Sequence, residues 1–100
     1  MTRDAVRRYL ISYDIVDNRR RATVAKLLLR HGDRIQYSVF VVDAKPSRFI
    51  RLRRELIVTL RTREDSLLLC DLGALGQISQ RDFEVIGKER PITDSGSFIV

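Results

Sequence analysis

Residues 9–21, Tyr-Leu-Ile-Ser-Tyr-Asp-Ile-Val-Asp-Asn-Arg-Arg-Arg, decide the fold, because they join a predicted strand to a predicted helix. An apolar strand that ends in Asp14 must give this carboxylate a polar or charged partner if the side chain is buried. Three arginines in the first turn of a helix also oppose the helix macrodipole, which favours acidic residues there. Since two local rules are broken within a few residues, we expect this junction to carry the functional site.

Outward from the junction, hydrophobic periodicity predicts four strands and two helices. The strand that starts the junction places Tyr13 on one face and Asp14 on the other. Asn18 is a suitable N-cap for the first helix, and Pro46 suits the first turn of the second. The predicted strands are residues 8–16, 34–43, 66–72 and 78–86, and the predicted helices are residues 18–31 and 46–61.

This order of elements predicts a ferredoxin-like α+β sandwich, in which an antiparallel sheet has both helices on one face. We expect a single domain over residues 1–100, with its core in residues 8–86 and a variable connector and strand in residues 87–100. The apolar end of the chain, residues 97–100, should add a strand to its own sheet or to a partner's. No third helix is left for the second sheet face, so a second copy of the chain is the expected cover, which predicts a homodimer.

The apolar run at residues 66–72 indicates a strand covered on both faces, and Cys70 within it is interpreted as a buried, unreactive thiol. One cysteine and one histidine in 100 residues exclude a structural zinc site within one chain. Residues 1–8 lack the apolar core of a signal peptide, and no window is long and apolar enough for a membrane span. These features predict a cytoplasmic protein.

The charge balance favours a phosphate-bearing partner. Lys and Arg total 19 against 13 for Asp and Glu, a formal net charge of +6, and most of the cations are arginine. A guanidinium binds phosphate oxygens in a bidentate manner, so a nucleic acid is a better candidate than simple solubility. The predicted phosphate-binding residues lie around the junction and at the start of the second strand, namely Arg19, Arg20, Arg21 and Arg34.

Asp14 is the candidate catalytic and metal-binding residue. One carboxylate is a poor site for a hard cation, but a two-fold axis near the end of the first strand would bring two copies of Asp14 together. Two such carboxylates either share a proton or hold a cation, for which Mg²⁺ is the expected choice. Tyr13 and Phe40 are interpreted as core or interface residues rather than as stacking platforms.

The segments at residues 9–15 and at residues 33–40, Asp-Arg-Ile-Gln-Tyr-Ser-Val-Phe, together with the arginines between them, resemble the CRISPR-associated Cas-two family. Asp-Leu-Gly at residues 71–73 agrees with this resemblance, which covers residues 8–86. It implies a ferredoxin-like symmetric dimer whose C-terminal strand crosses to the partner, with Asp14 as the metal-associated residue. It also implies a part in nuclease function or its geometry for Tyr13, Arg21, Arg34 and Phe40. Thr23 stands where some members carry a second basic residue.

The resemblance further implies a function in CRISPR adaptation. A homodimer would bind duplex DNA and bridge the Cas-one integrase during spacer acquisition, and Mg²⁺-dependent endonuclease activity on single-stranded RNA or on DNA is a second family role. Whether this chain cleaves at all is left open. Two alternatives also stay open: a toxin-type ribonuclease of the same fold, and a non-catalytic ligand-binding regulatory domain, which would be expected to carry a glycine-rich loop in place of the arginine-rich junction.

Overall fold

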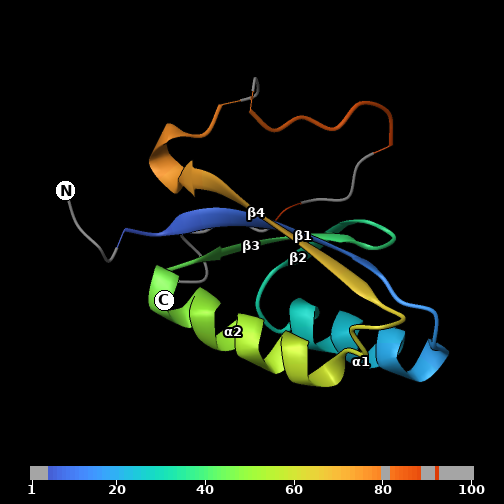
Figure 1. The fold of residues 1–100 in the computed structure, drawn as a ribbon. Coiled ribbons are helices and arrows are strands. Elements are labelled where there is room, and N and C mark those ends of the chain that lie inside the picture. The colour runs from blue at the N-terminus through green and yellow to red at the C-terminus, as the bar shows by residue number, and fades with distance from the viewer. Residues whose placement is uncertain (1–4, 80–81, 89–91, 93–100) are drawn as a thin grey trace.

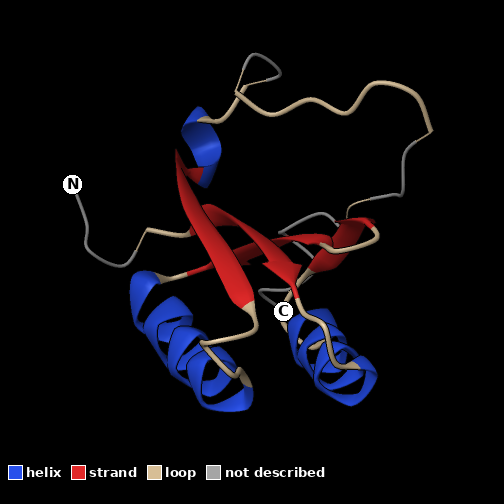
Figure 2. Cartoon of the chain, turned by 45° about the vertical axis from the view of Figure 1, so that its right-hand side comes forward, coloured by secondary structure: helices blue, strands red, loops and turns tan. Residues whose placement is uncertain are grey.

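The computed structural model describes residues 5–79, 82–88 and 92. Two helices lie side by side on one face of a four-stranded sheet, as Figures 1 and 2 show. The strand order is β2-β3-β1-β4, and every neighbouring pair is antiparallel. The predicted ferredoxin-like α+β arrangement is therefore confirmed. The elements are β1 (Arg7–Asp14), α1 (Asn18–Leu29), β2 (Asp33–Gln36), β3 (Val39–Ala44), α2 (Pro46–Thr59) and β4 (Ser66–Ala74), followed by a 3-10 turn at Leu75–Gln77.

The core lies between the helices and the sheet. From β1, the side chains of Ile11 and Tyr13 point into it, as the alternation of apolar residues predicts. Each helix buries one apolar stripe against the sheet. Pro46 occupies the first turn of α2, where its missing N–H costs no helical hydrogen bond. The stripe residues buried against the sheet are Val24, Ala25, Leu27 and Leu28 of α1, and Leu52 and Leu56 of α2.

The predicted strand at residues 34–43 is wrong as one element, because the chain reverses at Tyr37 and Ser38 and forms the β2–β3 hairpin. Residues 33–44 thereby supply two strands of the sheet. The turn residues include no Gly, Pro, Asn or Asp, and Ser38 is only a weak turn signal, so the sequence did not mark a turn clearly at this position. The carbonyl of Ser38 accepts a hydrogen bond from the backbone N–H of Tyr13 at 3.1 Å, which fixes the turn beside the end of β1.

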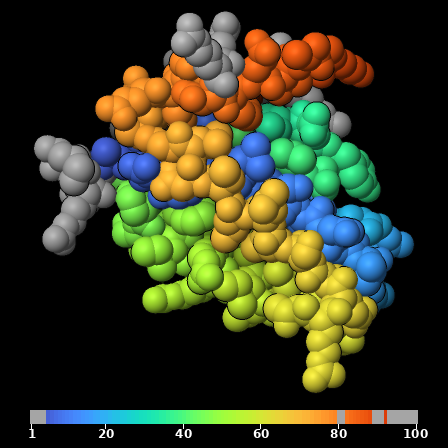
Figure 3. Space-filling view, turned by 45° about the horizontal axis from the view of Figure 1, so that its top comes forward, coloured from blue at the N-terminus to red at the C-terminus, as the bar shows by residue number. Residues whose placement is uncertain are grey.

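The prediction that residues 66–72 are covered on both faces does not hold within a single chain. Within the described part of the chain β4 pairs only with β1, so it forms an edge of the sheet. Leu68 is 61% exposed, and Cys70 is exposed rather than buried. Figure 3 shows the residues of β4 as a diagonal band on the molecular surface. The long apolar run therefore reflects a strand buried on its helix side only, where Leu67 and Leu69 pack against the core.

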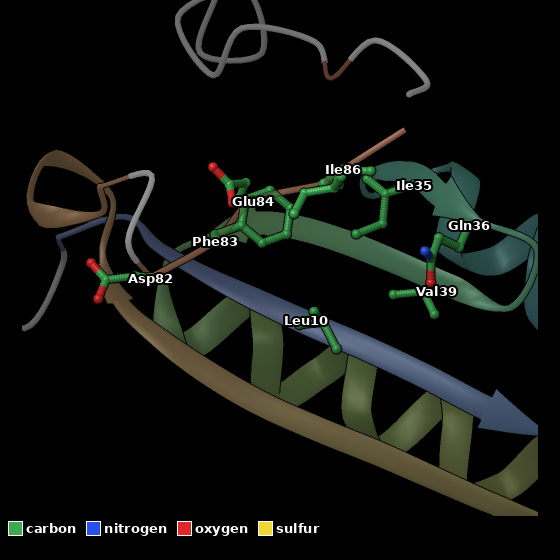
Figure 4. A pocket seen from close by; sticks show the side chains of 9 residues that line it. Leu10, Ile35, Gln36, Val39, Asp82, Phe83, Glu84 and Ile86 are labelled. Carbon is green, nitrogen blue, oxygen red and sulfur yellow. The ribbon is translucent and has the colours of Figure 1, made fainter. Parts of the chain in front are cut away.

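The predicted strand at residues 78–86 is not a strand in the described residues. The 3-10 turn diverts the chain after β4. Residues 82–86 then cross the open face of the sheet, which is the face opposite the two helices (Figures 1 and 4). The segment encloses a hollow of about 320 Å³ over Leu10, Ile35 and Val39. This open face thus has a partial cover from its own chain. The predicted strand at residues 97–100 lies outside the described residues.

Gly32 is required by close approach between α1 and β3. A Cβ atom at this position would lie 2.0 Å from the carbonyl oxygen of Val41, which is a severe clash with backbone. Glycine, which has no Cβ atom, therefore fits between the end of α1 and β3 at this position. No helix of the described residues is long and apolar enough to span a membrane.

Candidate nucleic-acid and metal site

Asp14 is the last residue of β1, at the end of the sheet where the hairpin turn and the start of α1 also lie. Its cross-strand neighbour is Ser66, the first residue of β4. The side chain is exposed, and no described group is recorded as hydrogen bonded or ion paired to its carboxylate. The expected cost of burying this carboxylate therefore does not arise, because water reaches it. Asp14 is left open to a ligand that approaches this end of the sheet.

The helix that follows begins with a different cap from the predicted one. Asp17, not Asn18, is the N-cap, and its carboxylate accepts a hydrogen bond from the backbone N–H of Arg20 at 2.9 Å. This hydrogen bond is the main reason that the pKa of Asp17 lies below its usual value. A negative charge at the cap also offsets part of the unfavourable interaction between three arginines and the helix dipole.

Asp65, in the loop between α2 and β4, fixes the strand–helix junction through hydrogen bonds. Its side chain is fully buried and accepts hydrogen bonds from the Arg20 guanidinium at 2.8 and 3.3 Å. It also accepts from the backbone N–H groups of Val16 at 3.3 Å and Arg61 at 3.0 Å. The hydrogen bond from Arg20 is the largest cause that lowers the pKa of Asp65 to about 2. Asp65 thus ties together the end of β1, the start of α1 and the end of α2.

This network changes the interpretation of Arg20. The residue was predicted to bind phosphate, but its guanidinium donates to a buried carboxylate and lies 3.6 Å from Glu64 as well. Asp65 was not among the site residues predicted from the sequence. Since 45 positions separate the two partners, the local pattern could not indicate the pair.

Arg21 is also engaged with its own chain. Its guanidinium donates to the carbonyl oxygen of Ile15 at 2.7 Å and to the side-chain oxygen of Asn18. Together, Arg20 and Arg21 hold the backbone between Asp14 and the helix start.

Arg19 differs from its two neighbours because it is exposed, and no described side chain pairs with its guanidinium. Its backbone carbonyl accepts a hydrogen bond from the Thr23 hydroxyl at 2.9 Å. Of the three consecutive arginines, Arg19 is therefore the one whose charge is available to an external phosphate.

The remaining predicted residues gather near the hairpin. Arg34 and Phe40 are cross-strand partners, and the Arg34 guanidinium lies 5.0 Å from the centre of the Phe40 ring. Phe40 is fully buried and Tyr13 is 5% exposed, with their ring centres 6.0 Å apart. Both aromatic residues are thus core residues, as the sequence predicted. The Arg34 guanidinium also lies 5.8 Å from the ring of Tyr37, a residue that the sequence analysis did not select.

The donor set for magnesium is incomplete within one chain. Among the described residues no three acidic, histidine or cysteine side chains gather closely enough to hold a metal ion. Mg²⁺ commonly binds one or two carboxylates and completes its shell with water and phosphate oxygens. The exposed and unpaired Asp14 fits this pattern, provided that a second carboxylate or a phosphate joins it.

Comparison with known proteins agrees with the geometry. Residues 7–77 match the family model of CRISPR associated protein Cas2. The CRISPR-associated endoribonuclease Cas2 3 of Synechocystis sp. is 41% identical over 93 residues, which cover 92% of this chain and 97% of that protein.

Solved structures give the same result. The crystal structure of the hypothetical protein TT1823 from Thermus thermophilus has a TM-score of 0.72 and 32% identity, and the match covers 88% of this chain and 99% of the other. Streptococcus pyogenes Cas2 at pH 6.5 has a TM-score of 0.68 and 29% identity, with 80% of this chain and 99% of the other covered. The match to the family model, the similar relative and the shared fold show that the chain belongs to the family of CRISPR associated protein Cas2.

Proposed function

We propose that this protein acts in CRISPR adaptation as a homodimer that binds duplex DNA and bridges the Cas-one integrase, and that it has Mg²⁺-dependent endonuclease activity at Asp14. The observation that carries the proposal is the exposed, unpaired carboxylate of Asp14 at the end of β1. Hydrogen bonds fix the backbone that follows it. The names of the relatives, CRISPR-associated endoribonuclease Cas2, support hydrolysis of a phosphodiester bond. Net charge supports a nucleic acid as the partner.

The open sheet face supports the homodimer. Cross-strand pairs place Leu10 beside Cys70 and Ser12 beside Leu68 on this face, and residues 82–86 cover only part of it. A second copy packed sheet to sheet would remove Leu68 from water and would duplicate every residue about the two-fold axis. Two Asp14 carboxylates could then serve one metal site.

In the proposed reaction Arg19 binds a backbone phosphate and orients the strand across the end of the sheet. Asp14 would hold Mg²⁺, which supplies charge neutralisation at the phosphodiester when it is bound. Asp65 and Arg20 keep the backbone at Val16 in place, so Asp14 is presented at a fixed position. Preorganised charges of this kind contribute to a reaction because little reorganisation is needed when charge develops.

Cleavage of labelled single-stranded RNA and duplex DNA, in Mg²⁺ and in chelator, tests the proposal. Asp14→Asn should reduce the cleavage rate by roughly 100-fold or more, since a metal ligand is lost while size is preserved. Glu55→Gln, at an exposed carboxylate on α2, is the matched control and should leave the rate unchanged. Cleavage that persists in Asp14→Asn or in chelator would contradict the metal site and leave a DNA-binding scaffold. A monomer mass by light scattering would contradict the dimer.

A further inference from the structure

Tyr37 at the tip of the β2–β3 hairpin is exposed in a way that the other aromatic residues are not. Its side chain is 68% exposed, whereas Tyr9 and Tyr13 are 4% and 5% exposed. Among the aromatic side chains in the described residues, only that of Tyr37 is mostly exposed. A phenol ring on a turn contributes nothing to the core, so its apolar faces are available for contact with a planar ligand.

Arg34 lies between this exposed ring and the buried ring of Phe40. Its guanidinium carbon is 5.8 Å from the centre of the Tyr37 ring and 5.0 Å from that of Phe40. Contact with two aromatic faces orients the guanidinium. No carboxylate of the described residues forms an ion pair with Arg34, and its buried Nε has no hydrogen-bond partner there. The cation is therefore positioned but not neutralised.

The hairpin tip lies next to Asp14. The backbone N–H of Tyr13 donates to the carbonyl of Ser38 at 3.1 Å. Asp14 directly follows Tyr13 in the chain, and Tyr37 directly precedes Ser38. A strand that passes Asp14 therefore passes the hairpin tip, where the Tyr37 ring is exposed. Figure 1 shows the β2–β3 hairpin at the same end of the sheet as the connection from β1 to α1.

We propose that Tyr37 and Arg34 form a binding site for one unpaired nucleotide of the nucleic acid at Asp14. Tyr37 would stack on the base, and Arg34 would donate to the adjoining phosphate. An unpaired base exposes a π face that can stack on an aromatic ring, whereas bases within a duplex are already stacked on both sides. This inference rests on the proposed nucleic-acid function and adds a preference: single strands, or duplexes with an overhang, over blunt duplexes.

The experiment uses a single-stranded decamer that carries one 2-aminopurine, beside a blunt duplex of the same length. Wild-type protein should quench 2-aminopurine fluorescence, because stacking on a tyrosine ring quenches this base. Tyr37→Ala should weaken single-strand binding by roughly 5- to 150-fold and abolish the quench, since loss of one base–aromatic stack has this effect. Tyr37→Phe keeps the ring and should bind within about 3-fold of wild type.

The blunt duplex separates this site from the rest of the binding surface. Its affinity should change less than about 3-fold in Tyr37→Ala, because it presents no unpaired base to the hairpin. Wild-type affinity and quenching in Tyr37→Ala would overturn the stacking site while the proposed function stands, as would equal weakening for both probes. A wild-type protein that binds neither probe would overturn the nucleic-acid role itself. A change of oligomeric mass in Tyr37→Ala, with unchanged quenching, would assign the ring to a protein contact instead.

Discussion

The strand–helix junction at residues 14–21 and the segment at residues 82–88 differ in the contacts that hold them to the rest of the chain. In the junction, Asp65 accepts from the backbone N–H of Val16 and from the Arg20 guanidinium, and Arg21 donates to the carbonyl of Ile15. In the segment, the hydrogen bonds are local to the chain: Ser79 accepts from the backbone N–H groups of Asp82 and Phe83, and the Asp82 carboxylate accepts from the backbone N–H and the hydroxyl of Ser79. The contact that reaches the sheet is a cation–π contact of Phe83 with Arg8 at 5.5 Å. A strand-like pattern becomes a strand only where a partner edge is in reach, whereas the junction is fixed by a buried carboxylate and by two guanidinium groups.

The largest effect is expected from breaking the junction at Asp65. Asp65→Asn leaves the Arg20 guanidinium opposite a neutral group in a buried position and should lower Tm by roughly 10 °C or more. Thermal unfolding followed by circular dichroism measures this shift. Asp71→Asn, which removes one partner of the exposed pair with Arg7, is the control and should lower Tm by less than about 4 °C. Equal shifts in the two variants would show that the buried network does not stabilise the fold.

Acid titration tests the same carboxylate. The folded pKa of Asp65 is about 2, below its usual value of 3.8, so the contribution of this carboxylate to stability is complete at pH values above 3.8. The contribution is lost as pH falls from about 4 toward about 2, because the unfolded chain then binds the proton more readily. The free energy of unfolding measured against pH should therefore fall more steeply in wild type than in Asp65→Asn. Parallel curves would contradict the assigned pKa shift.

A smaller effect is expected in the segment. Phe83→Ala removes a half-buried ring that covers the open sheet face and should cost less than about 1 kcal/mol of unfolding free energy. Urea denaturation gives the value, with Glu84→Gln as the exposed neighbour for reference. A cost of several kcal/mol would place the segment in the core and remove the contrast with the junction.

The main elements of the fold could be predicted because local patterns in the sequence indicate them. The alternation in β1, the stripe of α2 and Pro46 at the start of that helix all hold in the structure. The hairpin turn at Tyr37 and Ser38 could not be predicted, since Tyr37 favours strands, Ser38 is only a weak turn signal and the strand-like pattern continues through them. The error at residues 78–86 has a related cause: alternation shows which face a strand would bury, but not whether an edge is available.

The candidate site was predicted in outline but not in the roles of its arginines. Asp14 at a strand end followed directly from the sequence, as did the core positions of Tyr13 and Phe40. Three adjacent arginines look equivalent in a sequence, yet the structure engages Arg20 and Arg21 internally and leaves Arg19 exposed. That difference depends on Asp65 and on the path of the backbone, which are tertiary features.

Chemical-shift mapping tests most directly the claim that nucleic acid binds at the Asp14 end of the sheet. Duplex DNA would be titrated into ¹⁵N-labelled protein, and the shift of each backbone amide followed. The account predicts the largest changes at Asp14, Arg19 and the neighbouring junction, because Arg19 offers the free charge there. Changes concentrated on the exposed arginines of α2, Arg51 and Arg54, with an unperturbed junction, would contradict it.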